Sequence, residues 1–151
     1  MKYLYAPNRN FEDYASGRVI YATPGQPAFP VRLASEIFQR GLAHWQAASG
    51  EGLCRLYDPT CGGGYWLVAL AWLHWDRLAT IYASDIQRDA VNLAARNLSL
   101  LSISGLDRRI VEIEKMLADY GKVSHAVALE SAHKFRAQLG KELESHPIST
   151  Q

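Results

Sequence analysis

The sequence predicts an α/β domain whose strands are parallel and covered by helices. Two short apolar segments, residues 54–58 and 79–83, each stop at or just before an acidic residue, and a helical pattern follows each of them. This alternation is typical of βαβ units. The 151 residues are 48% hydrophobic and 21% charged, which is the composition of an ordinary globular domain. We therefore expect one domain organised around a parallel sheet.

Composition argues against several classes of protein. The formal net charge is only +1, so a nucleic acid would have to be bound by a local basic patch. Apolar runs are shorter than a membrane span, and the N-terminus has no apolar core of signal-peptide type, so we expect a cytoplasmic protein with no membrane partner. Cys54 and Cys61 form no disulfide framework, and the five histidines are scattered, so we expect no metal site.

The first 29 residues are expected to form an arm that precedes the domain at residues 30–151. Three prolines in TPGQPAFP, residues 23–30, argue against a helix or a central strand there. From Pro30 onward apolar residues recur at helical spacing, which predicts a helix over residues 30–47. A linker at residues 47–52 then leads to the strand CRLYDP, which stops at Asp58-Pro59.

The segments after residue 64 alternate in type. The run YWLVALAWLHW at residues 65–75 is too long for one strand and predicts a buried helix, with Trp66, Trp72 and Trp75 in the core. A strand at 79–83 precedes a helix whose buried positions share one face. These positions are Ala90, Leu93, Ala94, Asn97 and Leu98. Two more helices are predicted at 106–120 and 124–145, and residues 146–148 open a third strand.

Two or three parallel strands do not normally make a self-sufficient sheet, because such strands are buried on both faces and their edges must be covered. The pattern is therefore that of the first half of an α/β domain, with an additional helical segment. We expect the apolar helix at 65–75 to be left partly open. If the 151 residues are complete, we also expect homo-oligomers that cover this surface.

The segment Asp58-Pro-Thr-Cys-Gly-Gly-Gly-Tyr65 lies between a predicted strand and a predicted helix. Glycines there allow a ligand to approach the backbone, and the helix N-terminus supplies free N–H groups. A phosphate-binding P-loop would need Gly-Lys-Ser/Thr where Gly64-Tyr65-Trp66 stands. A dinucleotide motif would need a small residue at Leu67. Neither of these two nucleotide sites therefore fits.

The same segment resembles the D-P-x-C-G-x-G motif of Rossmann-like S-adenosylmethionine-dependent methyltransferases that modify RNA and DNA bases. Asp85 follows Asp58 by 27 residues at the end of the second predicted strand, and ASDIQRDAVNLAARN resembles the D-x-x-x-x-A-x-x-x-A-x-x-N pattern of that family. A carboxylate at such a strand end can accept both ribose hydroxyls of a nucleoside. The resemblance implies that Asp85 binds the ribose and that Asp58 accepts a hydrogen bond near the amino group of the cofactor.

Residues 17–151 resemble more specifically the avilamycin-resistance family of 23S ribosomal RNA guanine-N1 methyltransferases. The stretches RVIYATPGQPAFPVRLASEIFQRGLA and NLSLLSISGL carry this likeness. The resemblance implies a Rossmann-like fold, S-adenosylmethionine as cofactor, ribosomal RNA as partner, and cofactor contacts from Arg32, Asp58, Cys61, Gly62, Gly63, Gly64 and Asp85. In this family the segment like PVRLA leads into the cofactor site, so Arg32 is a candidate partner of the methionine carboxylate.

The sequence departs from the family in one respect. The acidic or Asn-Pro-Pro-Tyr type loop that holds the target base is not found, so the catalytic residues are unknown. Our leading hypothesis is a methyltransferase that acts on a guanine of ribosomal RNA. A rival hypothesis is a truncated, non-catalytic interaction module, and a third is a methyltransferase of small molecules or DNA that shares only the cofactor motifs.

Each site residue also has an interpretation without a ligand. Gly62–Gly64 can form a tight turn, Asp58 can begin a turn, and Asp85 can cap the following helix. Arg32 can be a surface residue, and Cys61 a small turn residue with no base to activate it.

The aromatic and basic residues of the arm likewise allow two interpretations: stacking on the bases of RNA, or packing on the body of the domain. These residues are Lys2, Tyr3, Tyr5, Arg9, Tyr14, Arg18 and Tyr21.

Overall fold

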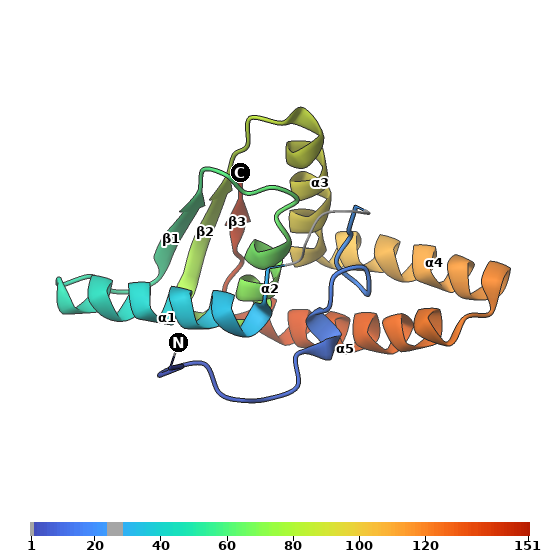
Figure 1. The fold of residues 1–151 in the computed structure, drawn as a ribbon, viewed down its shortest axis with the longest axis horizontal. Helices are drawn as coiled ribbons and strands as arrows, with labels where there is room; N and C mark the ends of the chain where they lie inside the picture. The colour runs from blue at the N-terminus through green and yellow to red at the C-terminus, as the bar shows by residue number, and fades with distance from the viewer. Residues whose placement is uncertain (1, 24–28) are drawn as a thin grey trace.

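A computed structural model describes residues 2–23 and 29–151, and its elements follow the predicted order (Figure 1). Residues 24–28, the centre of the proline-rich segment, lie outside the described residues. The helices and strands are α1 (Val31–Ala47), β1 (Cys54–Asp58), α2 (Tyr65–Leu73), β2 (Leu78–Ala83), α3 (Arg88–Leu98), α4 (Ile103–Tyr120), α5 (Val123–Ser145) and β3 (Ser149–Thr150). Short 3₁₀ turns occur at Glu12–Tyr14, Trp75–Arg77 and Ser99–Leu101.

The three strands form one parallel sheet in the order β1-β2-β3, which confirms the predicted fold class. Asp58 at the end of β1 pairs with Ala83 at the end of β2, so both carboxyl ends lie at one edge of the sheet. The third strand begins at Ser149, just after the predicted position, and pairs with β2 at Thr80 and Ile81. Within the described chain β1 has a strand neighbour on one side only.

Helices α4 and α5 form a long antiparallel hairpin beside the sheet (Figure 1). Helix α4 begins at Ile103, three residues before its predicted start, because the Ser102 hydroxyl caps it and accepts the Gly105 N–H at 3.1 Å. Its other end is closed by Gly121 at φ 61°, in the left-handed region. None of the helices placed by the structure is both long and apolar enough to cross a membrane.

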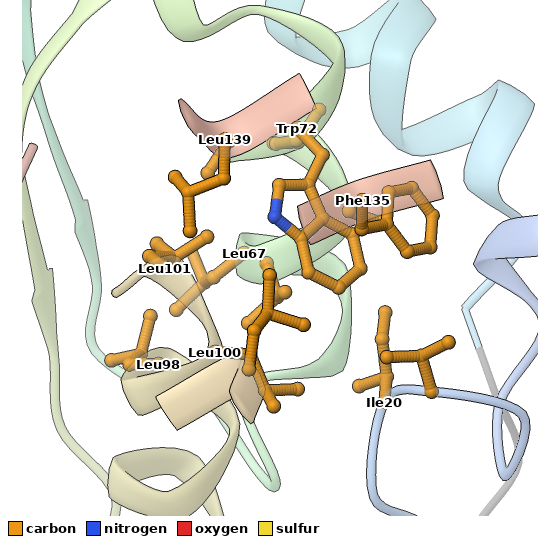
Figure 2. Close-up of a cluster of buried hydrophobic side chains, with 14 of the residues drawn as sticks. Ile20, Leu67, Trp72, Leu98, Leu100, Leu101, Phe135 and Leu139 are labelled. Atoms are coloured by element: carbon orange, nitrogen blue, oxygen red, sulfur yellow. The ribbon is translucent and has the colours of Figure 1, made fainter. Parts of the chain in front are cut away.

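The core lies around α2 and also takes side chains from α1, β2, α3, α4, α5 and the arm; Figure 2 shows part of it. Its labelled side chains are Ile20, Leu67, Trp72, Leu98, Leu100, Leu101, Phe135 and Leu139. The rings of Trp72 and Phe135 stack with centroids 3.9 Å apart. Every residue of α2 from Leu67 to Trp72 is at most 3% exposed. The expectation that this helix is left partly open is therefore wrong, because α5 and the arm cover it. Self-association stays a prediction, but it no longer has an exposed apolar helix to support it.

The arm packs on the body at its first residues through a buried carboxylate. Glu36 of α1 is 0% exposed, and its carboxylate accepts the N–H groups of residues 4–6 at 2.8–2.9 Å. Arg40 completes the set at 2.7 Å. Burial alone would raise the pKa of Glu36, but these donors together lower it to about 2. The charge of Glu36 thus fixes the beginning of the arm on α1.

Further along, the arm reaches α5. The Ser131 hydroxyl donates to Asp13 at 2.6 Å, and the ring of Tyr14 meets the ring of Phe135 edge-on at 5.1 Å. Tyr14 therefore packs on the body of the domain, which is one of the two roles considered for the aromatic residues of the arm. For Tyr3, the guanidinium of Arg32 lies 4.1 Å from the ring centroid. Contact of the arm with RNA stays a prediction.

Candidate functional site

The glycine loop and the end of β2 meet at the carboxyl edge of the sheet. The Ser84 N–H donates to the carbonyl of Asp58, and the Cys61 N–H donates to the carbonyl of Ser84, both at 3.0 Å. These bonds continue the pairing of β1 and β2 beyond the strands and bring Asp85 beside the loop. The two acidic motifs, 27 residues apart in sequence, form one site.

The carboxylate of Asp85 binds the loop directly. Its Oδ2 accepts the Gly62 N–H, and its Oδ1 accepts the Gln87 N–H, each at 2.9 Å. The bonds from Gln87 and Gly62 lower the pKa of Asp85, which is therefore ionised at neutral pH. Each carboxylate oxygen has a second lone pair, so Asp85 can still accept hydroxyl groups of a ligand. The contact with Gln87 shapes the turn that leads into α3, but Gln87 lies before the helix, so this bond is not a helix cap.

Asp58 is 7% exposed and shapes the loop from within. Its Oδ1 accepts the Thr60 N–H at 3.0 Å, and its Oδ2 accepts the indole N–H of Trp66 at 2.7 Å. Trp66 was expected in the core, but its side chain is only half-buried and lies along the loop. Trp66 therefore packs against the edge of the core rather than inside it, because its indole N–H is directed to Asp58 in the loop. A contact between Asp58 and a cofactor stays a prediction.

The glycines of the loop have different surroundings. Gly62, at φ 52°, has open space where a Cβ atom would stand. At Gly64, with φ 66°, a Cβ atom would lie 3.1 Å from Cα and Cβ of Ala94. Gly64 therefore permits close packing of the loop on α3, whereas Gly62 leaves the space beside the loop free.

A cavity of about 330 Å³ lies between the glycine loop and the arm, within the range of small-molecule sites. One wall is formed by Thr60–Gly63 with Tyr65 and Trp66. The opposite side is formed by the arm, at Ser16 and Tyr21–Thr23, with Phe29 and Leu93 completing the lining. Residues of the N-terminal arm are thus part of the cavity that the loop faces.

Cys61 lines the cavity as a neutral thiol. Its side chain is 5% exposed, and its Sγ lies 3.4 Å from the carbonyl oxygen of Gly62. Burial, and then the charges of Asp58 and Asp85, raise the pKa of this thiol. The geometry favours the turn role for Cys61 over nucleophilic chemistry.

Arg32 does not line this cavity. Its Nε and Nη2 donate to the carbonyl of Ala6 at 3.2 Å, and its Nη1 lies 3.4 Å from Oδ1 of Asn8. The side chain therefore holds the arm on α1, and its contact with a cofactor carboxylate stays a prediction.

Tyr21 and Asn97 belong to the site, although Tyr21 was considered only as a residue of the arm and Asn97 as the last residue of the acidic pattern that begins at Asp85. Asn97 was predicted on the buried face of its helix, and its side chain is 0% exposed. It bonds to Tyr21 of the arm and to Gly63 of the loop. The available signal was an amide on an apolar face, since a buried amide requires hydrogen-bond partners.

A second cavity, of about 670 Å³, lies between α1 and β1. Its lining is mostly apolar and includes Phe38, Trp45 and Leu56. In the described part of the chain, no group of three or more His, Cys, Asp or Glu residues could hold a metal ion.

Comparison with known proteins identifies the family. A family model described as rRNA methyltransferase AviRa matches residues 1–151. The chain belongs to the AviRa family of rRNA methyltransferases.

A relative of this AviRa-family chain is a 23S rRNA (guanine(2535)-N(1))-methyltransferase from Streptomyces viridochromogenes, 43% identical over 141 residues. Two solved structures of rRNA methyltransferase aviRa from the same organism match with TM-scores of 0.89 and 0.90 at 40% identity. They cover 100% of this chain, which in turn covers 60% of each. The alignment with the curated relative covers 93% of this chain and 55% of that protein. The chain therefore spans little more than half the length of the relatives it matches.

Proposed function

We propose that the protein is an S-adenosylmethionine-dependent methyltransferase that acts on a guanine of 23S ribosomal RNA, and that it binds the cofactor in the cavity between the glycine loop and the arm. The observation that carries the proposal is the bond between Asp85 and the Gly62 N–H. This bond places an ionised carboxylate beside the glycine loop that precedes the N-terminus of α2. The names of the AviRa relatives support ribosomal RNA as substrate, and an enzyme that acts on ribosomal RNA would work in the cytoplasm.

The residues of the cavity fit a nucleoside with a polar tail. Asp85 is not itself a lining residue, but it bonds to the lining residue Gly62, and from there its free lone pairs accept the ribose hydroxyls. The open side of Gly62 lets the ligand reach the backbone. Free N–H groups at the start of α2 suit a carboxylate. The aromatic side chains of Tyr21, Phe29 and Trp66 line the cavity from both walls and exclude water from it. When bound, S-adenosylmethionine supplies an electrophilic methyl group, and the contribution of the chain is to hold and desolvate it.

Calorimetric titration with S-adenosylhomocysteine tests the cofactor site. We expect Asp85→Ala to weaken binding roughly ten- to a hundredfold, because hydrogen bonds to a charged group are lost. Asp89→Ala is the matched control, since Asp89 is an exposed acid in the first turn of α3, whereas Asp85 is the acid that bonds to the glycine loop at Gly62. Equal affinities for the wild type and Asp85→Ala would contradict the ribose role. The activity itself is tested by transfer of a labelled methyl group from S-adenosylmethionine to 23S rRNA. The rival hypothesis, a non-catalytic interaction module, expects no transfer.

A further inference from the structure

Asn97 joins two segments that are far apart in sequence. Its Oδ1 accepts the Tyr21 N–H at 2.8 Å, and its Nδ2 donates to the carbonyl of Tyr21 at 3.1 Å. The same Nδ2 donates to the carbonyl of Gly63 at 2.7 Å. One side-chain amide on α3 therefore holds the arm and the glycine loop together.

Both segments are walls of the same cavity. Tyr21 lines it from the arm, and Gly63 lines it from the loop. Asn97 lies behind both, with no exposed surface, and is not a lining residue. Its hydrogen bonds thus set the distance between the arm and the glycine loop, although Asn97 itself does not face the cavity.

The ring of Tyr21 is fixed separately, from α3 and α4. The guanidinium groups of Arg96 and Arg109 lie 3.8 and 4.3 Å from its ring centroid, and its hydroxyl donates to Glu112 at 2.9 Å. Arg109 also donates to the carbonyls of Val19 and Arg18. Arg109 thus holds the arm backbone just before Tyr21, whereas Asn97 bonds to the backbone of Tyr21 itself and also to the glycine loop.

We infer that Asn97 is a positioning residue of the cofactor cavity, which sets the distance between the arm and the glycine loop so that both walls meet the ligand. The inference rests on the proposed function of the cavity. An amide suits the task because it offers one acceptor to the Tyr21 N–H and two donors to the two carbonyls. A carboxylate of the same shape would keep the acceptor but place a negative oxygen against both carbonyls.

The test compares affinity with stability in Asn97→Ala, in the isosteric Asn97→Asp, and in Leu139→Ala. Leu139 is 1% exposed, belongs to α5 and does not line the cavity, so its truncation destabilises the fold without touching the walls. For each variant the Kd of S-adenosylhomocysteine is measured by calorimetry at a temperature well below its Tm. We expect both Asn97 variants to raise Kd at least tenfold, and Leu139→Ala to leave it within about twofold even where its Tm falls as far.

Hydrogen exchange of the wild type supplies a second measurement, which needs no variant to fold. We expect S-adenosylhomocysteine to increase the protection of residues 18–23 and 60–65 together. An unchanged Kd in Asn97→Asp, or protection of residues 60–65 alone, would overturn the inference while the cofactor site stands. A wild-type protein that does not bind S-adenosylhomocysteine would overturn the cofactor site and the inference with it.

Discussion

The hydrogen bond between Trp66 and Asp58 is predicted to stabilise the glycine loop, and its contribution to the free energy of unfolding can be measured. Trp66→Phe removes the N–H that donates to Oδ2 of Asp58 at 2.7 Å and keeps most of the apolar ring. Asp58 is 7% exposed, so the oxygen is left poorly solvated. Loss of a hydrogen bond to a charged group costs about 1.5 to 3 kcal/mol. For a chain of 151 residues this corresponds to a fall in Tm of roughly 3 to 12 °C.

Trp72→Phe is the matched control, because the indole nitrogen of Trp72 is buried and has no hydrogen-bond partner among the residues that the structure describes. That substitution loses packing against Phe135 but no hydrogen bond. Urea unfolding of Trp66→Phe, Asp58→Ala and the double variant gives the coupling energy between the two side chains. We expect about 1 kcal/mol or more for this pair. A coupling energy near zero would refute a role for this bond in holding the loop.

Two further predictions concern the loop and the arm. Gly62→Ala should cost about 1 to 2 kcal/mol of unfolding free energy from its left-handed backbone, and Gly64→Ala about 2 kcal/mol or more, because its methyl group also meets Ala94; equal costs in urea unfolding would contradict the packing of the loop on α3. The pKa of Glu36 is lowered from 4.5 to about 2, so its contribution to stability is complete above about pH 4.5 and is lost as the pH falls toward 2. Glu36→Gln should remove this part of the pH dependence, and an unchanged slope of stability between pH 5 and 3 would show that Glu36 is not the group responsible.

The order of elements and the meeting of the two acidic motifs could be predicted from the sequence, because both depend on local patterns. Helical spacing predicted α1 and α5 to within a residue or two at each end. Parallel strands bring their carboxyl ends to one edge, so Asp58 and Asp85 had to lie near each other. The start of α4 was placed too late because the Ser102 cap precedes the apolar pattern.

The path of the arm could not be predicted, since its side-chain contacts with the helices join residues 24 to 121 positions apart. Nothing local in the sequence shows which backbone groups Glu36 accepts or which carbonyls Asn97 reaches. Trp66 was misplaced for a related reason. A strongly apolar helix has no clear polar face, so periodicity alone does not show which tryptophan turns toward the loop.

Four polar side chains that are buried on helices hold the arm: Glu36 on α1, Ser131 on α5, Arg109 on α4 and Asn97 on α3. Buried polar groups of this kind are costly when their partners leave, so docking of the arm is favoured as a unit rather than residue by residue. Because the last of these side chains also holds the glycine loop, a ligand that binds between the two walls stabilises the docked arm. By the same linkage, a docked arm strengthens ligand binding. In its described residues the arm has no regular secondary structure beyond one 3₁₀ turn. Side chains of the body therefore hold it in place as one wall of the cavity.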